Sequence, residues 1–232
     1  MAPTSESQLR HEFYATKLRS RQLAFDIGAN HGFHTAAMLH RGARVVAVEP
    51  QAKLAAELAD HFPGAIILPV AVSDEAGRAN LHLVPGRDYM ASLDATWSHD
   101  HLNYLRKTVP GDHDALSWTS QGTKQVEVTT LDRLIAQYGE PTVAKIDTEG
   151  LDHQVLRGLS RPVDHILFEV HAARRESALD AFGRLEQLAR YDYYGAPLDT
   201  WLFRSRQRPE EIISEFDGCP SGVGDVYARH VG

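Results

Sequence analysis

Short apolar runs rich in β-branched residues alternate with segments of helical periodicity along this 232-residue chain. The apolar runs, each of strand length, lie at residues 23–27, 44–50, 65–72, 143–147 and 165–170. The segments with helical spacing lie at residues 34–40, 51–61, 129–137, 151–159 and 177–190. This alternation predicts an α/β, Rossmann-like fold, in which helices cover both faces of a mostly parallel sheet. The third run is apolar except at Pro69, so we expect both of its faces to be covered.

Three regions fall outside this alternation. Residues 1–22 are predicted to form an N-terminal helical extension, and the C-terminal tail is expected to supply the last, antiparallel strands. Residues 85–122 form a long polar insert between two shorter predicted strands at 81–84 and 125–128. A loop of this length is uncommon in a compact domain unless it binds a ligand or lacks order. The whole chain is predicted to be a single domain.

The ends of the first two apolar runs carry residues suited to an adenosine cofactor. In open α/β sheets, ligands bind beyond the carboxyl ends of the strands. Gly28 and Gly32 permit a tight turn after the first run, with Asp26 and Asn30 beside them. Glu49 ends the second run, about twenty residues past the first glycine, where an acidic residue binds ribose hydroxyls. The alternative is a plain turn followed by a solvated Glu49, but the combination of residues favours a cofactor site.

The first turn also indicates which cofactor binds. A dinucleotide fingerprint needs a glycine at position 30, so that backbone N–H groups can hold a pyrophosphate, but Asn30 stands there. Asp26 would moreover repel a pyrophosphate. S-adenosylmethionine has no phosphate, and acidic residues attract its ammonium and sulfonium cations. The sequence therefore favours S-adenosylmethionine over NAD.

Several longer segments resemble the FkbM-type methyltransferases. They follow one another in the order of the family's motifs: FDIGANHGFHT at 25–35, VAVEP at 46–50, AVSD at 71–74 with Gly77, TLD at 130–132 and KIDTEG at 145–150. The combination is specific, although each motif alone is not. The resemblance implies a class I methyltransferase fold with a seven-stranded, mostly parallel sheet. It also implies S-adenosylmethionine as the donor and, often, O-methylation of sugars or secondary metabolites.

The resemblance places Ser73 and Asp74 beside the adenine, so both are candidate cofactor contacts. For Asp74, an ordinary turn before Gly77 explains the residue equally well. The chain departs from the family pattern in two places. The insert at residues 85–122 is long, and we expect it to border the acceptor site. Thr148 stands where the family commonly has valine, which is a substitution of one β-branched residue for another.

The fourth and fifth apolar runs end in candidate catalytic residues. A hydroxyl acceptor must lose its proton to a base or bind a metal ion before it attacks the methyl group. Period-two alternation places Asp147 with Glu149, and Glu169 with His171, on one side of each strand. All four are expected to meet beside the transferable methyl group, and Asp147 is also a candidate cofactor contact. His171 is the favoured base, because an unperturbed imidazole titrates near ~6.5.

Other interpretations of these residues stay open. Asp147 and Glu169 could hold Mg²⁺, as carboxylates do in catechol-type methyltransferases, although a metal is not favoured. Glu149 could instead favour the start of the helix that follows it. The insert contains three histidines that lack the spacing of a metal site: His99, His101 and His113. It also contains three aromatic residues that would either face a ring-shaped acceptor or pack the insert: Trp97, Tyr104 and Trp118.

Two other functions are compatible with the same fold. An NAD-dependent short-chain oxidoreductase would need a glycine at position 30 and a Tyr-x-x-x-Lys pair, which Tyr138 does not provide. A catalytically inactive, methyltransferase-fold binding subunit would have no need of Asp26, Glu49 and Asp147 together. The favoured function is S-adenosylmethionine-dependent O-methylation of a hydroxyl on a sugar or secondary metabolite.

Composition and charge indicate which binding partners and which cellular compartment to expect. The net charge of −7 argues against a nucleic-acid partner, because such affinity depends on neutralising phosphates. Cys219 is the only cysteine, so no disulfide can form within the chain and a reducing cytoplasm is expected. The polar N-terminus does not resemble a signal peptide, and no apolar run approaches the ~20 residues that span a membrane. The expected acceptor is a small molecule or glycan, and a homodimer is compatible with the sequence.

Overall fold

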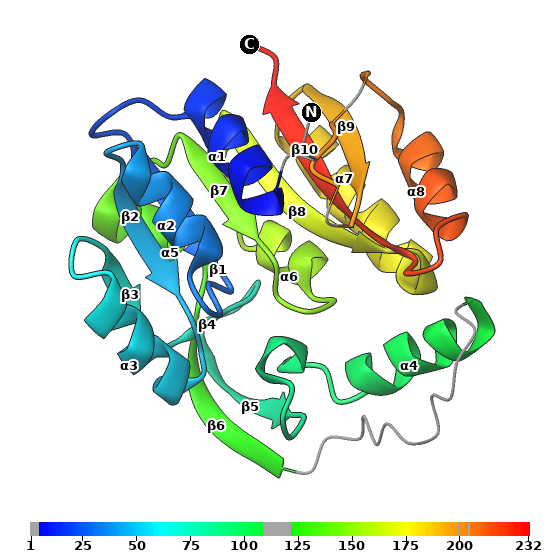
Figure 1. Ribbon diagram of the computed structural model, residues 1–232, viewed down its shortest axis with the longest axis horizontal. Coiled ribbons are helices and arrows are strands. Elements are labelled where there is room, and N and C mark those ends of the chain that lie inside the picture. Colours follow the sequence, from blue (N-terminus) through cyan, green and yellow to red (C-terminus); the bar gives the residue numbers. More distant parts are fainter. Residues whose placement is uncertain (1–4, 109–121, 199, 204) are drawn as a thin grey trace.

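The computed structural model describes residues 5–108, 122–198, 200–203 and 205–232. Its centre is a seven-stranded sheet with the strand order β3-β2-β1-β7-β8-β10-β9 (Figure 1). The strands are β1 (Leu23–Ile27), β2 (Arg44–Val48), β3 (Ile66–Leu68), β7 (Val143–Ile146), β8 (His165–His171), β9 (Tyr191–Pro197) and β10 (Val223–His230). Neighbouring strands are parallel except where β10 pairs with β8 and β9. The predicted Rossmann-like, class I methyltransferase fold is confirmed.

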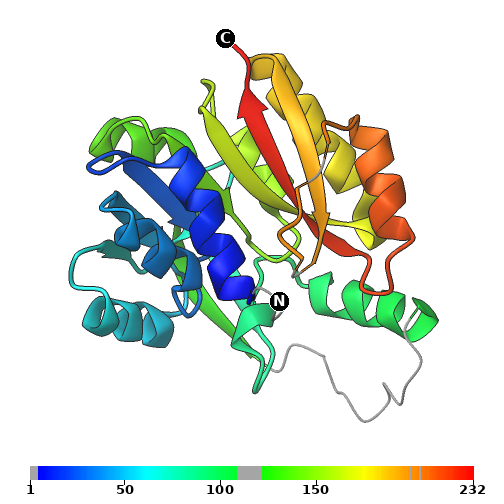
Figure 2. The same cartoon turned by 45° about the horizontal axis from the view of Figure 1, so that its top comes forward.

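Helices cover both faces of this sheet because both faces are apolar. One face carries α1 (Glu6–Lys17), α2 (Phe33–His40) and α3 (Ala52–His61), and the other carries α5 (Leu131–Tyr138), α6 (Asp152–Arg157), α7 (Arg175–Leu188) and α8 (Pro209–Asp217) (Figures 1 and 2). Every residue of β1 is buried: Phe25 and Ile27 pack on the second group of helices, and Ala24 packs on the first. The period-two alternation of a strand thus supplies both layers of the core.

The N-terminal segment forms the predicted helix. Ser5 caps α1 by accepting a hydrogen bond from the backbone N–H of Gln8. Tyr14 is fully buried in the cluster that also contains residues of α2, and the ring of Phe13 packs against that of Tyr227 in β10. The helix is therefore fixed across the sheet rather than projecting from it (Figure 2).

The third apolar run is split between two sheets. Ile66–Leu68 forms β3 at the edge of the large sheet, whereas β4 (Ala71–Val72) joins a small sheet of order β4-β6-β5. Its other members are β5 (Gly77–Leu83) and β6 (Gly122–Thr129). Pro69 lies between the two parts and has no N–H with which to continue a ladder. The expectation that both faces of this run are covered was wrong for β3, because Ile66 is exposed.

The described part of the insert is more regular than predicted. It contains a short 3₁₀ helix, η1 (Asp88–Met90), and the helix α4 (Trp97–Thr108). A small apolar cluster of Val84, Met90 and Leu102 holds it together. Residues 109–121, which include His113 and Trp118, lie outside the described residues. Within the described part of the chain, no helix is long and apolar enough to cross a membrane.

Candidate functional site

A cavity of about 420 Å³ opens at the carboxyl ends of β1, β2 and β7. Six of the residues predicted from the sequence line it: Gly28, Asn30, Glu49, Asp147, Glu149 and Glu169. Further walls come from α1, the start of α2, β4, β5, β10, the insert and the segment after β9. Open α/β sheets bind ligands at this edge, and the volume suits a small-molecule site.

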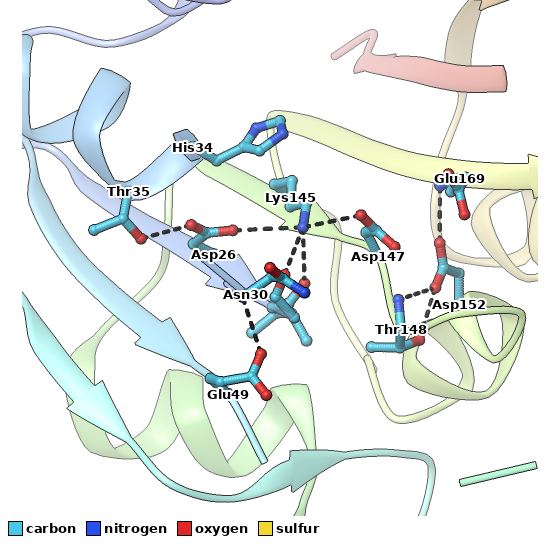
Figure 3. Close-up of polar contacts among 12 residues, drawn as sticks. Asp26, Asn30, His34, Thr35, Glu49, Lys145, Asp147, Thr148, Asp152 and Glu169 are labelled. Atoms are coloured by element: carbon cyan, nitrogen blue, oxygen red, sulfur yellow. Dashed lines mark hydrogen bonds and ion pairs between the residues drawn. The ribbon is translucent and has the colours of Figure 1, made fainter. Parts of the chain in front are cut away.

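Lys145 of β7 occupies the centre of the polar network beneath the cavity (Figure 3). Its side chain is only 5% exposed, and its Nζ lies 3.3 Å from an Asp147 oxygen and 3.7 Å from an Asp26 oxygen. The Nζ also donates a hydrogen bond to the carbonyl of Gly28 at 2.8 Å. Burial lowers the pKa of Lys145, but the nearby Asp147 and Asp26 carboxylates outweigh burial and raise the pKa above its ordinary value. The ammonium is therefore charged in the folded protein.

Two of the predicted cofactor residues shape the first loop and do not line the cavity. Asp26 is fully buried and accepts a hydrogen bond from the Thr35 hydroxyl at 2.6 Å, so it joins β1 to α2 and to Lys145. Gly32 faces away from the cavity, because an added Cβ would lie 2.4 Å from the Phe62 ring. The two residues are thus placed to hold the loop in shape, and neither faces the cavity in which a cofactor would bind.

Gly28 and Asn30 set the backbone of the loop. Gly28 has a φ of +73°, and an added Cβ would lie 1.8 Å from the carbonyl oxygen of Asp147. Only a glycine permits this close approach between the β1 and β7 loops. Asn30 also has a positive φ, of 47°, and its N–H donates to Glu49 at 2.9 Å.

Glu49 is held in one orientation by two backbone donors. One carboxylate oxygen accepts from the N–H of Asn30 and the other from the N–H of Gln51, both at 2.9 Å. Burial raises the pKa of Glu49, and these hydrogen bonds act in the opposite direction. A carboxylate has about four acceptor sites, so each oxygen retains capacity for a further donor such as a ribose hydroxyl. Glu49 lines the cavity wall, and its role as the ribose contact stays a prediction.

Asp152 connects the β7 loop to β8, a function that the sequence analysis missed. One of its oxygens accepts from the N–H and the hydroxyl of Thr148, both at 2.7 Å, and the other accepts from the N–H of Glu169 at 2.8 Å (Figure 3). Its place in the first turn of α6 was the only signal of such a role. Thr148 in place of valine therefore adds a hydrogen bond that valine could not make.

Glu169 and His171 form a close pair, but only Glu169 lines the cavity. Nε2 of His171 contacts a carboxylate oxygen of Glu169, and the imidazole lies behind it, buried against Trp97. The prediction that His171 itself faces the acceptor is not supported by this placement. Burial lowers the pKa of His171 to about 4 and raises that of Glu169 well above its usual value. Burial thus favours the neutral form of both groups.

Glu149 is fixed by the insert. Its carboxylate accepts from the Trp97 indole at 3.1 Å, and its backbone carbonyl accepts from the Ser92 hydroxyl at 2.9 Å. Burial and then the Asp147 charge raise the pKa of Glu149 well above its usual value. The N-cap of α6 is Leu151, with no side-chain cap, so Glu149 does not cap that helix.

The other predicted residues of the insert and of the adenine side lie outside the cavity. Trp97 is buried and stacks on His101, and the Tyr104 hydroxyl donates to the Asp217 carbonyl, so both pack the insert. His99 is exposed. Ser73 and Asp74 do not line the cavity; Ala71 and Val72 of β4 do. Among the described residues, no group of three His, Cys, Asp or Glu side chains could hold a metal ion.

The wall of the cavity on the side of α1 was not predicted from the sequence. Arg10 of α1, His34 of α2 and Trp201 after β9 line the cavity, and the Tyr14 hydroxyl contacts Nδ1 of His34 at 2.7 Å. These residues are far apart in the chain and have no shared motif. The helical periodicity of residues 6–17 was the available signal, but it gave no indication of what the helix covers.

The segment that carries this geometry matches the family model described as "Methyltransferase FkbM domain" over residues 26–194, more than half of the chain. The chain belongs to the FkbM methyltransferase family. This assignment confirms the resemblance drawn from the motifs and makes the protein a member of an S-adenosylmethionine-dependent methyltransferase family. No curated protein matches the sequence.

Solved structures of several methyltransferases are similar to this FkbM domain at low identity. An rRNA methylase from Streptococcus thermophilus is 11% identical, with 100% of each chain covered and a TM-score of 0.49. A precorrin-6y C5,15-methyltransferase from Geobacter metallireducens is 11% identical, with 100% of this chain and 92% of that chain covered and a TM-score of 0.47. A TehB-like methyltransferase from Corynebacterium glutamicum is 11% identical, with 96% and 88% covered and a TM-score of 0.46.

Replacing Gly28 by alanine tests the contact between the β1 and β7 loops. The added methyl group collides with the Asp147 carbonyl at a strained φ, so we expect the free energy of unfolding to fall by about 2 kcal/mol or more. We also expect binding of S-adenosylhomocysteine to be lost. Gly77→Ala is the matched control, because nothing lies within 4 Å of its added Cβ. Denaturant unfolding and calorimetry measure both effects, and equal stability of the two variants would contradict the close approach.

Replacing Glu49 by alanine tests the proposed ribose contact. We expect affinity for S-adenosylhomocysteine to fall by about 1–3 kcal/mol, because a charge-assisted hydrogen bond is lost. Glu127→Ala, an exposed carboxylate on β6, should leave the affinity unchanged. Isothermal titration calorimetry gives both values. Unchanged affinity in Glu49→Ala would show that Glu49 does not bind the ribose.

Proposed function

We propose that this protein transfers the methyl group of S-adenosylmethionine to a hydroxyl of a sugar or secondary metabolite. The observation that carries the proposal is the arrangement of three carboxylates in one cavity. Glu49 and Glu169 lie at opposite ends of the group in Figure 3, with Asp147 between them, and all three line the cavity. This spacing suits a ligand whose ribose meets Glu49 and whose reacting end lies near Glu169.

The residues present fit the donor. The glycine cradle at Gly28 brings backbone close to the cavity, Glu49 has free acceptor capacity, and Asp147 offers a carboxylate that is one-third exposed. A cationic amino group and a sulfonium are attracted by such a wall, whereas a pyrophosphate is repelled. When bound, S-adenosylmethionine supplies an electrophilic methyl group on a sulfonium.

Glu169 is placed to accept the proton of the acceptor hydroxyl. It lines the cavity, whereas His171 contacts the same carboxyl from behind. Once Glu169 has lost its proton, an N–H of a neutral His171 can donate to the carboxylate and keep it aimed at the cavity. In this arrangement Glu169 is the base and His171 is a positioning residue. A base near the methyl group is what a hydroxyl acceptor requires.

The carboxylates already have partners that favour a base over Mg²⁺. Asp147 pairs with the ammonium of Lys145, and Glu169 pairs with His171. A divalent ion would have to compete with both contacts. We therefore propose that turnover does not require a metal.

Contacts of the insert support the proposal that it borders the acceptor site. Tyr89, Ala91, Ser92 and Leu93 line the cavity, and Arg174 after β8 pairs with Asp94 and Asp100 on either side of the start of α4. The Arg174 guanidinium also lies 5.3 Å above the Trp97 ring. These contacts fasten the described part of the insert to the ends of β7 and β8.

Incubation with labelled S-adenosylmethionine tests the acceptor class. The panel contains glycosides, phenols, small amines and a structured RNA, with extraction of labelled product as the readout. We expect label on glycosides or phenols and none on amines or RNA. Parallel calorimetry with S-adenosylhomocysteine and NADH separates the alternatives: tight NADH binding indicates an oxidoreductase, and binding of neither indicates an inactive subunit. Label on amines or RNA alone would overturn the proposal of hydroxyl methylation.

The pH dependence of turnover tests the base. Because burial raises the pKa of Glu169, we expect kcat to rise with pH through an apparent pKa above the usual carboxyl value of about 4.3. Glu169→Gln should remove this rise and lower kcat by roughly 10²–10⁴-fold. His171→Ala should cost less and move the midpoint to higher pH, because the carboxylate loses a charge-assisted hydrogen bond.

The control for the pH experiment is Glu127→Gln, which should behave as the unmodified protein. A chelator should leave turnover unchanged. Loss of activity on chelation with recovery on added Mg²⁺ would favour the metal alternative. A pH profile that Glu169→Gln does not alter would exclude Glu169 as the base.

A further inference from the structure

Arg10 is a cation in the cavity wall that lies outside the family-matched segment. It is 8% exposed, and its guanidinium lies over two aromatic rings, 5.5 Å from the centroid of Phe33 and 5.3 Å from that of Trp201. Its Nε is buried without a hydrogen-bond partner. The guanidinium pairs with Glu6, one turn earlier in α1. A guanidinium packed in this way is fixed in orientation.

The pairing with Glu6 leaves Arg10 incompletely compensated. The Glu6 side chain is 42% exposed, and an ion pair with a solvated partner contributes little. A buried cation is otherwise costly unless hydrogen bonds and counter-charges surround it. The Arg10 guanidinium can therefore donate to a second anion, one that is bound in the cavity.

The N-terminus of α2 adds a second positive element at the same place. The helix begins at Phe33 with no side-chain cap and no acidic residue in its first turn. Its first N–H groups have no partner within the helix, and the helix dipole makes this end partly positive. Phe33, on which Arg10 lies, and His34 both line the cavity.

The other fully charged cation of the cavity is already engaged. Lys145 donates to the Gly28 carbonyl and pairs with Asp26 and Asp147. Among the described residues that line the cavity, Arg10 is thus the lysine or arginine with donor capacity left for a ligand. The Asp and Glu side chains that also line the cavity favour a cation over an anion.

We propose that Arg10 and the N-terminus of α2 form a carboxylate-binding subsite of the cavity, supplied in part by the N-terminal helix. The carboxylate belongs either to the amino-acid part of the methyl donor or to an acidic acceptor, and both sources share the same recognition chemistry. An incoming carboxylate competes with Glu6, whose exposed side chain can turn to solvent. The donor version rests on the proposed function, whereas the acceptor version can be tested independently.

Calorimetry with two adenosyl probes tests the donor version. S-adenosylhomocysteine carries the carboxylate, and its decarboxylated analogue lacks only that group. We expect Arg10→Gln to lower the affinity for S-adenosylhomocysteine by about tenfold or more, because a charged hydrogen bond is lost. The affinity for the decarboxylated analogue should not change. Arg10→Lys should retain part of the affinity. Lys17→Gln, on the same helix but outside the cavity wall, is the matched control and should change neither value.

A second pair of probes tests the acceptor version. Phenyl glucuronide carries a carboxylate and phenyl glucoside does not, and both are titrated into protein saturated with S-adenosylhomocysteine. If the subsite serves the acceptor, Arg10→Gln should lose a preference for the glucuronide while its affinity for S-adenosylhomocysteine is kept. Selective loss of the carboxylate-bearing probe in either pair supports the proposal and identifies the source.

Three results would overturn the subsite. In the first, Arg10→Gln binds all four probes as the unmodified protein does. In the second, the variant loses affinity for the charged and neutral probes equally, which would mean that Arg10 only holds α1 in place. In the third, the unmodified protein shows no preference for a carboxylate in either pair. Failure of both adenosyl probes to bind the unmodified protein would instead count against the proposed function, and the glucuronide pair, titrated without S-adenosylhomocysteine, would then decide the subsite.

Discussion

The buried ammonium of Lys145 is the charge on which the cofactor end of the sheet depends. Removing an ammonium from water costs several kcal/mol, and here two carboxylates and a backbone carbonyl offset that cost. The arrangement is mutual, because Asp26 is fully buried and has Lys145 as its counter-charge. Loss of Lys145 would leave two carboxylates without their counter-charge beneath the cavity. The lysine therefore fixes the end of β1 against the end of β7.

The rest of the donor side follows from this contact. Lys145 holds the carbonyl of Gly28, and Gly28 in turn has no Cβ to separate it from the Asp147 carbonyl. The loop then continues to Asn30, whose N–H binds Glu49 at the end of β2, so three strand ends form one polar network. The opposite wall is built differently, by aromatic packing of α1 against Trp201 and the start of α2. One side of the cavity is ordered by buried charge pairs, and the other by aromatic and cation–π packing.

Elements whose cause is local could be predicted from the sequence. Four of the five apolar runs became strands of the large sheet, whose faces are both covered by helices, and the third run was split between the two sheets. The network around Lys145 could not be predicted, because it depends on the register that pairs Asp26 of β1 with Lys145 of β7. In the sequence Lys145 is only a charge within an apolar run. The place of Arg10 in the cavity wall could not be predicted for a similar reason, since nothing near it in the chain shows where its helix packs.

Burial shifts the pKa values of Glu169 and His171 in opposite directions, and this reverses the preference for histidine as the base. A free imidazole titrates near neutrality, so the sequence favours histidine as the base. Burial disfavours the charged form of each group, which lowers the pKa of His171 and raises that of Glu169. Burial therefore favours a neutral imidazole beside a carboxyl group whose pKa is raised. The group that faces the cavity, rather than the one with the better reference pKa, is then the one that can exchange a proton with an acceptor.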